Sequence, residues 1–122
     1  MNSERNFFLN RIKSVKFAAK GCWILITTEK SIIAQVSIAI FMTIVGFLMN
    51  ISATEWLFQI IAISIILVAE SLNTAIEKMA DFIHPEYHEK IGFIKDVSAG
   101  AAFFAAIFAV IIGLIIYIPK FI

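Results

Sequence analysis

The chain has 122 residues, of which 61% are hydrophobic and 16% are charged, and its net charge is +1. A soluble protein of this length could not bury so much apolar surface in its own core, so the composition favours a membrane protein. The near-neutral charge gives no indication of a nucleic-acid partner, and a single cysteine excludes an internal disulfide framework. The length leaves room for one domain, residues 1–122.

The N-terminal segment, residues 4–28, alternates basic and apolar side chains, which is typical of an amphipathic helix on a membrane surface. The basic positions are Arg5, Arg11, Lys13, Lys16 and Lys20. A solvated basic tail is the alternative, but it would leave several phenylalanines in water. The segment is not a cleavable signal peptide, because the first long apolar run begins only after about thirty residues.

Three charge-free stretches are candidate spans, and the first and third are long enough to cross a bilayer outright. The second reaches that length only if it continues through Glu70, so the spans are expected at about residues 31–53, 56–80 and 97–118. The sequence therefore predicts an all-α membrane protein with one surface helix and three transmembrane helices. Basic residues concentrate in the N-terminal segment and in the 78–96 loop, which places both on the cytoplasmic side. Trp56 and Tyr117 then fall at the opposite interface, where aromatic side chains are frequent.

The second span carries polar residues at i, i+3, i+7 and i+11, the spacing of one helix face: Glu70, Asn73, Glu77 and Asp81. Counted from Trp56, Glu70 lies about 21 Å deep and Glu77 about 31 Å deep, near the cytoplasmic boundary. A carboxylate inside the membrane is a candidate functional group, and Glu70 is suited to take a proton from a lipid hydroxyl. Glu77 and Glu29, which precedes the first span at the same level, are candidate oxygen ligands of a divalent cation.

The third span begins with Lys95 and Asp96, and Lys95 could neutralise a phosphate group. Ordinary interfacial ion pairs are the alternative for this region, with Glu77 and Asp81 bound to Lys78 or Lys95. The small residues that follow, Ser98, Ala102 and Ala106, recur every four positions. Such a row lets helices pack closely, either within one protomer or between copies of the chain.

The segment His-Pro-Glu-Tyr-His-Glu at 84–89 does not have the spacing of the H-E-x-x-H zinc motif, and Pro85 predicts a turn. A solvated loop and a contact to phosphate or adenine both remain open for it. The chain contains none of the glycine-rich phosphate loops and no protein-kinase signature. A phosphotransferase with this sequence would use none of the familiar soluble nucleotide folds.

Together these motifs resemble the bacterial diacylglycerol kinase family, which includes undecaprenol kinases. They are Glu70-Ser-Leu-Asn73-Thr-Ala-Ile-Glu77, Asp81, Glu86-Tyr87-His88, and Lys95-Asp96 before an alanine-rich span. The resemblance covers nearly the whole chain. It implies a homotrimer with active sites shared between neighbouring subunits, using Mg²⁺ and ATP to phosphorylate a lipid hydroxyl. It also implies a multi-pass protein of the bacterial inner membrane with a cytoplasmic N-terminus.

The resemblance assigns roles to individual residues of this sequence. Glu70 would be the general base, Asn73 would orient the catalytic groups, and Glu29 and Glu77 would hold Mg²⁺. The nucleotide site would be lined by Phe17, Glu29, Glu77, Glu86, Tyr87, His88, Lys95 and Asp96. The family often has tyrosine at the position of Phe17, and some members have arginine at that of Asn10, where this chain offers only the adjacent Arg11.

The leading hypothesis is phosphorylation of a membrane lipid alcohol, with diacylglycerol favoured slightly over undecaprenol. A small proton-coupled transporter, with Glu70 as the ion-binding carboxylate, is the alternative from a different class. Against it, the acidic face rises into the charged cytoplasmic loop instead of crossing the membrane. A non-enzymatic scaffold would not explain why the chain places the carboxylate of Glu70 inside the membrane, which is energetically unfavourable.

Overall fold

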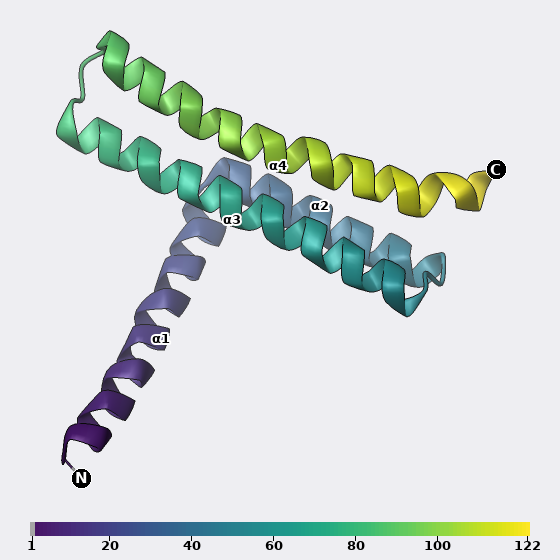
Figure 1. Ribbon diagram of the computed structural model, residues 1–122, viewed down its shortest axis with the longest axis horizontal. Coiled ribbons are helices and arrows are strands. Elements are labelled where there is room, and N and C mark those ends of the chain that lie inside the picture. Colours follow the sequence, from purple (N-terminus) through teal and green to yellow (C-terminus); the bar gives the residue numbers. More distant parts are fainter. Residues whose placement is uncertain (1) are drawn as a thin grey trace.

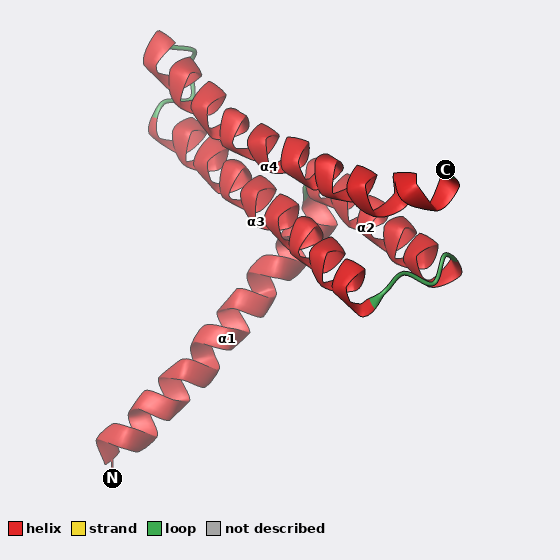
Figure 2. Ribbon diagram, turned by 45° about the vertical axis from the view of Figure 1, so that its right-hand side comes forward, coloured by secondary structure: helices red, strands yellow, loops and turns green. Residues whose placement is uncertain are grey.

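The computed structural model describes residues 2–122 as four helices joined by short connections, as Figure 1 and Figure 2 show. The helices are α1 (Asn2–Thr28), α2 (Lys30–Leu48), α3 (Ala53–Ile83) and α4 (Glu89–Phe121). Among the residues described, α2, α3 and α4 are each long and apolar enough to cross a membrane. The prediction of an all-α membrane protein with one surface helix and three spanning helices is confirmed.

The second and third spanning helices extend beyond the predicted apolar segments at the ends that flank residues 84–88. Helix α3 continues to Ile83 and α4 begins at Glu89, so only residues 84–88 of the expected 78–96 loop lie outside a helix. The charged residues of this region are therefore held on rigid helix ends, which fixes their relative positions better than a flexible loop would.

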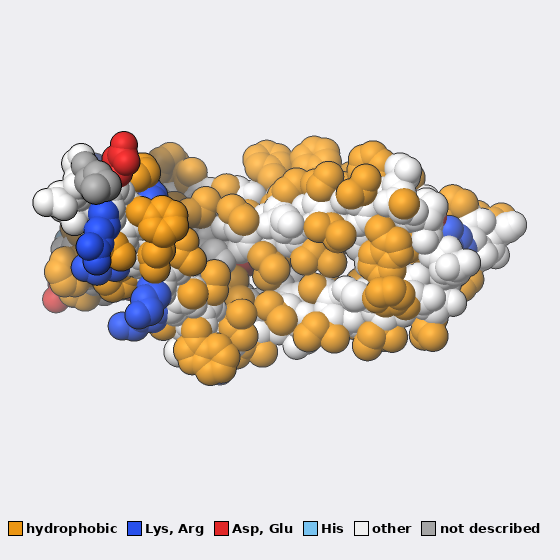
Figure 3. All heavy atoms as spheres, turned by 90° about the horizontal axis from the view of Figure 1, so that it is seen from below, with side chains coloured by type: hydrophobic (Ala, Val, Ile, Leu, Met, Phe, Trp, Pro, Cys, Tyr) orange, Lys and Arg blue, Asp and Glu red, His pale blue; other side chains and the backbone are white. Residues whose placement is uncertain are grey.

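Helix α1 runs across the direction of the other three helices, as expected of a helix on the membrane surface (Figure 1). The change of direction occurs at Glu29, the only residue between α1 and α2, whose backbone is extended with φ −99° and ψ 114°. Lys and Arg side chains gather at the α1 end of the molecule, and hydrophobic side chains cover most of the rest of the face seen in Figure 3. This distribution suits a basic helix at the headgroups and an apolar bundle in the bilayer.

Helices α3 and α4 lie side by side along most of their length (Figures 1 and 2). The small residues Ser98, Ala102 and Ala105 are the buried positions on the first half of α4, exposed by 8% or less. Their size lets the two backbones approach closely, which is how helices associate in lipid. Ser98 and Ala102 of the small-residue row therefore pack within one chain, together with the neighbouring Ala105, whereas Ala106 is only half-buried.

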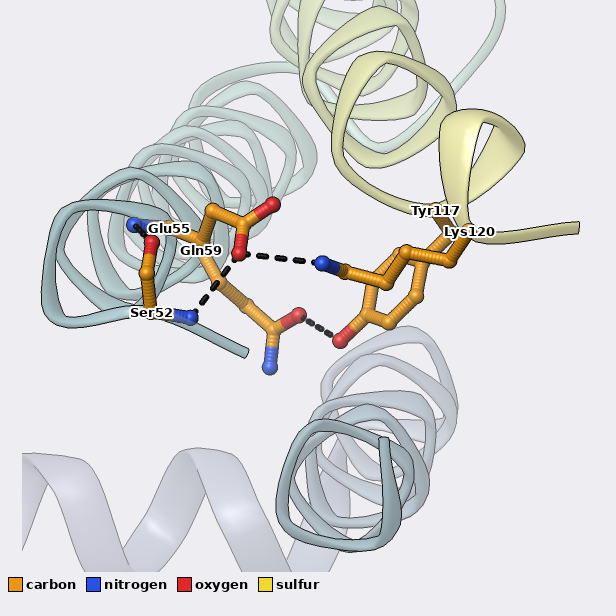
Figure 4. Close-up of polar contacts among 5 residues, drawn as sticks. All are labelled: Ser52, Glu55, Gln59, Tyr117 and Lys120. Carbon is orange, nitrogen blue, oxygen red and sulfur yellow. Dashed lines mark hydrogen bonds and ion pairs between the residues drawn. The ribbon is translucent and has the colours of Figure 1, made fainter. Parts of the chain in front are cut away.

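At the end of the bundle farthest from residues 84–88, a polar clasp formed by Ser52, Glu55, Gln59, Tyr117 and Lys120 joins α3 to α4 (Figure 4). Ser52 and Glu55 form a reciprocal capping box that begins α3. Glu55 Oε1 also accepts a hydrogen bond from Lys120 Nζ at 3.1 Å, and Tyr117 donates its hydroxyl to Gln59 Oε1 at 2.5 Å.

The clasp changes the interpretation of Tyr117. The sequence placed it among the aromatic side chains of the membrane interface, but it is only 9% exposed and points toward Gln59. The other half of the Gln59 amide donates from Nε2 to the Met42 carbonyl oxygen at 3.0 Å, which brings α2 into the same network. A buried tyrosine hydroxyl needs a hydrogen-bond partner, and Gln59 provides one inside the bundle, so the Tyr117 ring can point inward.

We expect Gln59→Leu to lower the stability of the bundle by about 1–2 kcal/mol, because it removes two interhelical hydrogen bonds and leaves the Tyr117 hydroxyl unpaired. Gln35→Leu is the matched control, since the Gln35 side chain makes no hydrogen bond within residues 2–122. Unfolding in mixed detergent, followed by circular dichroism, would measure both variants. Equal stability of the two would show that the two Gln59 hydrogen bonds contribute nothing to the stability of the bundle.

Candidate active site

The polar face of α3 is directed toward α4 at two levels. Ser98 Oγ donates a hydrogen bond to Asn73 Oδ1 at 2.7 Å, and Lys95 Nζ donates to Asp81 Oδ1 at 2.5 Å. Glu77 lies four residues from both Asn73 and Asp81, so it falls between them on the same face, where it is half-buried. The polar face predicted from the spacing therefore lies along the α3–α4 contact.

Glu70 lies one turn deeper than Asn73 and is also half-buried. It forms no ion pair or side-chain hydrogen bond within residues 2–122. The ion pair on this face is instead formed by Asp81, which lies nearer to residues 84–88. The carboxylate of Glu70 is thus a polar group inside a spanning helix with both oxygens available to a ligand.

Glu29 reaches α3 through an ion pair with Lys78, with Lys78 Nζ 3.0 Å from Glu29 Oε1. This contact places the start of α2 at the level of Glu77, the residue that precedes Lys78. The Glu29 side chain is 22% exposed and that of Lys78 is 67% exposed, so the lysine can move away without disturbing packing. The ion pair engages only Oε1 of the Glu29 carboxylate, and a carboxylate oxygen is the kind of ligand that hard divalent cations prefer.

The chemistry of these residues fits a hard divalent cation. In residues 2–122 no three side chains of histidine, cysteine, aspartate or glutamate gather into a cluster that could hold a metal by themselves. Two carboxylates from Glu29 and Glu77 nevertheless suffice for Mg²⁺, which usually takes one or two protein carboxylates and fills its other positions with water and phosphate oxygens.

A hollow of about 250 Å³ lies where the loop at 84–88 meets the start of α4. It is lined by His84, Pro85, Glu86, Tyr87, Ile91, Gly92, Lys95 and Asp96. Four of the predicted nucleotide-site residues, Glu86, Tyr87, Lys95 and Asp96, are therefore brought together in one place. The Tyr87 ring lies close over Gly92, where a Cβ atom would be 3.2 Å from Tyr87 Cε2, so a larger residue there would displace the ring by a few tenths of an ångström.

The loop beside the hollow is held by two histidines. His84 Nδ1 lies 2.6 Å from the Glu86 carbonyl oxygen, and His88 Nδ1 accepts a hydrogen bond from the Lys90 amide at 3.0 Å, capping α4. His88 thus borders the hollow as a helix cap instead of lining it. Ile91 and Gly92 of the first turn of α4 line the hollow, and helix N-termini favour anions such as phosphate.

The predicted residues on α1 do not join this site within one chain. Phe17 is 73% exposed, Asn10 and Arg11 are also exposed, and none of the three lines the hollow. The Arg11 guanidinium lies instead over the ring of Phe7, 5.4 Å from its centroid.

The structure decides one question that the sequence left open and adds one contact that the sequence did not predict. The Lys95–Asp81 pair was one of the alternatives left open, whereas Lys78 binds Glu29 and not Glu77 or Asp81. The Ser98–Asn73 hydrogen bond was missed, because Ser98 was interpreted only as a small packing residue. A polar residue within the small-residue row, on the span that follows an intramembrane asparagine, was the available signal.

A helical membrane protein in which a half-buried carboxylate inside a spanning helix leads along one helix face to a lysine-lined hollow has the features of a membrane-embedded phosphotransferase. Comparison with known proteins agrees: the family described as prokaryotic diacylglycerol kinase matches residues 16–117. The chain is 37% identical over 113 residues to the undecaprenol kinase of Bacillus subtilis (strain 168), covering 92% of each chain. It is 31% identical over 108 residues to the diacylglycerol kinase of Escherichia coli (strain K12), covering 85% of each.

The chain therefore belongs to the prokaryotic diacylglycerol kinase family. It is a lipid kinase of the membrane that uses ATP, as the resemblance of its motifs implied.

Proposed function

We propose that the chain transfers the γ-phosphate of Mg-ATP to the hydroxyl group of a lipid alcohol at the cytoplasmic face of the bacterial inner membrane. One observation carries this proposal: the polar face of α3 runs from Glu70, inside a spanning helix, to Asp81, which binds Lys95 at the exposed hollow. A lipid hydroxyl approaches from the bilayer and a nucleotide from water, so their reaction needs a polar path between those two depths.

In this proposal the hollow receives the nucleotide. Lys95 provides a cation for the phosphates, and Glu86, Tyr87, His88 and Asp96 surround them and the base. Lys95 reaches the hollow while bound to Asp81 at 2.5 Å, so its position is fixed before the nucleotide arrives. Preset charges of this kind carry most of the catalysis in phosphoryl transfer.

Glu29 and Glu77 would hold Mg²⁺ between them and the phosphates. The cation, when bound, neutralises charge on the transferred phosphoryl group. Glu29 is prepared for this role by its position at the joint between α1 and α2, where its side chain already faces the ammonium of Lys78. Lys78 is mostly exposed and is free to leave when a stronger cation arrives.

Glu70 acts as the general base. It takes the proton of the lipid hydroxyl while the hydroxyl oxygen forms a bond to the γ-phosphorus, and the bond from that phosphorus to the leaving ADP oxygen breaks. Asn73, one turn away on the same face, orients the reacting groups. No cation of the described chain competes for the Glu70 carboxylate.

We further propose a homotrimer in which neighbouring subunits share active sites. Support comes from α1, where Phe17 is strongly exposed and does not reach the hollow of its own chain. A neighbouring subunit would supply the contact that a single chain leaves incomplete. Chemical cross-linking in detergent, followed by mass measurement, would test the stoichiometry.

Diacylglycerol is the acceptor that the sequence analysis favoured, and phosphatidic acid is then the product. Undecaprenol is the second candidate, and a specific observation favours it: identity to an undecaprenol kinase is 37%, against 31% to a diacylglycerol kinase. Both alcohols present a hydroxyl group on long apolar chains. Sequence identity by itself therefore favours undecaprenol over diacylglycerol as the acceptor.

The experiment is transfer of radiolabelled phosphate from Mg-ATP to diacylglycerol and to undecaprenol, offered separately and then as equal mixtures in detergent micelles. We expect transfer that requires a divalent cation, and a preference of at least tenfold in kcat/KM for one alcohol. The preferred lipid in the mixture identifies the acceptor. Absence of transfer to both lipids, from protein shown to be folded, would overturn the proposed function.

A further inference from the structure

Ser98 directs its hydroxyl group differently from the other helical serines of this chain. Four of them donate to the carbonyl oxygen four residues earlier, at 2.6–2.9 Å: Ser14, Ser37, Ser64 and Ser71. Ser98 instead donates across to Asn73 Oδ1, 25 residues away in sequence. It gives up the usual local partner of a helical serine for a contact with the neighbouring helix.

In this hydrogen bond one half of the Asn73 amide is engaged and the other half remains available. The carbonyl half is engaged by Ser98, so the NH₂ half, with its two donors, is turned away from α4. Asn73 forms no other side-chain hydrogen bond within residues 2–122. Side chains on a helix lean toward its N-terminus, so the amide of Asn73 extends over the turn that carries Glu70.

The orientation matters because the two halves of an amide act oppositely on charge. An NH₂ group donates to carboxylate and phosphate oxygens, whereas a carbonyl oxygen in its place would repel them. Donors preset toward developing negative charge are among the strongest sources of catalysis. An asparagine with a free amide would spend part of its time turned the wrong way.

Burial makes the contact durable. Ser98 is 6% exposed and lies between α3 and α4, on the same buried side of α4 as Ala102 and Ala105. Water has little access to replace its hydroxyl group, and the close packing around it leaves its rotamer little freedom. The position therefore provides both the donor and the rigidity that orienting an amide requires.

We propose that Ser98 is a positioning residue that fixes the Asn73 amide so that its NH₂ group faces the phosphoryl-transfer site beside Glu70. This inference rests on the proposed function, because it assigns Asn73 a place beside the reacting groups. Ser98 itself touches no substrate and acts only through Asn73. The simpler role, adhesion between α3 and α4, would make Ser98 matter for stability and not for the turnover rate.

The kinetic test compares Ser98→Ala with Ser64→Ala, which removes a serine hydroxyl whose bond is local to α3. We expect Ser98→Ala to lower kcat about three- to tenfold, since one neutral hydrogen bond holds the amide, with KM for ATP and for the lipid unchanged. Ser64→Ala should match the wild type. Alanine is a good helix former, so Ser98→Ala should not disturb α4. Ser98→Cys nearly preserves the volume of the side chain but has a weaker donor, and it should give an intermediate kcat.

Two further readouts separate positioning from adhesion. In an Asn73→Asp background, where no NH₂ group remains to be oriented, Ser98→Ala should cause no further loss of kcat. In protein labelled with ¹⁵N-asparagine, the side-chain amide signals of Asn73, identified by their loss in Asn73→Asp, should shift or broaden in Ser98→Ala but not in Ser64→Ala.

The outcomes distinguish this proposal from the proposed function. Wild-type protein without lipid kinase activity would overturn the function, while the amide signals would still test the Ser98 contact. Unchanged amide signals in Ser98→Ala, or an equal loss of kcat in both Asn73 backgrounds, would overturn the positioning role. An unaltered kcat in folded Ser98→Ala protein would do the same.

Discussion

Glu70→Gln is expected to lower kcat for lipid phosphorylation by a factor of about 10²–10⁴, the usual contribution of a general base. Glutamine preserves the size of the side chain and its acceptor oxygen but cannot take a proton from the lipid hydroxyl. KM for ATP should change little, because Glu70 does not line the hollow where the nucleotide is proposed to bind. The measurement is steady-state transfer from Mg-ATP at varied ATP and lipid concentrations.

Glu55→Gln is the matched control, with the same substitution on the same helix but at the opposite end of the bundle. It weakens the pair with Lys120 and the capping box, so it should alter stability and leave kcat unchanged. Helical content of both variants should be compared before the kinetics. If folded Glu70→Gln protein kept more than about a tenth of wild-type kcat, Glu70 could not be the general base.

The main features of the fold could be predicted because they depend on periodicity and apolar length. Three apolar stretches set the spanning helices, and the spacing of Glu70, Asn73 and Glu77 placed them on one helix face, as found. What differed was the extent of the helices at the charged end, where only residues 84–88 break the chain. A charged helix end and a charged loop have the same composition, so hydropathy could not separate them.

The direction of individual side chains could not be predicted, because it depends on packing between elements distant in sequence. The position of Tyr117 suggested the membrane interface, and only its contact with Gln59, 58 residues earlier, turns it inward. Ser98 presents the same difficulty. Its hydroxyl group has a local carbonyl within reach in any helix, and only the approach of α3 offers Asn73 instead.

The residues of the proposed nucleotide site were predicted from motifs, and their grouping has a physical basis in the short turn between α3 and α4. A five-residue connection forces the end of one helix and the start of the next to lie side by side, which brings Tyr87 near Lys95. Phe17 lacks such a connection, since α1 leaves the bundle at Glu29. Sequence motifs give no distances, so they could not show that Phe17 lies away from the hollow of its own chain.

Lys95→Met is expected to lower kcat/KM for ATP by a factor of about 10²–10³, comparable with the loss of one preset donor to a developing charge. The methionine keeps the length and the apolar stem of lysine but removes the only cation that lines the hollow within the described chain. KM for ATP should rise and kcat should fall, because the lysine would contact phosphate before and during transfer. Lys95→Arg should recover part of the loss, since it restores the charge with a different shape.

Asp81→Asn separates the charge of Lys95 from its positioning. Asp81 binds Lys95 Nζ at 2.5 Å and is itself 58% exposed, so its role in the proposed site is to hold the lysine. Its neutral variant keeps the cation in the hollow but loosens it, and we expect a loss of only about two- to tenfold, in line with the modest strength of exposed ion pairs. Losses of equal size in Lys95→Met and Asp81→Asn would mean that the ion pair matters only as a link between α3 and α4. A much larger loss in Lys95→Met would place the ammonium group of Lys95 on the phosphates.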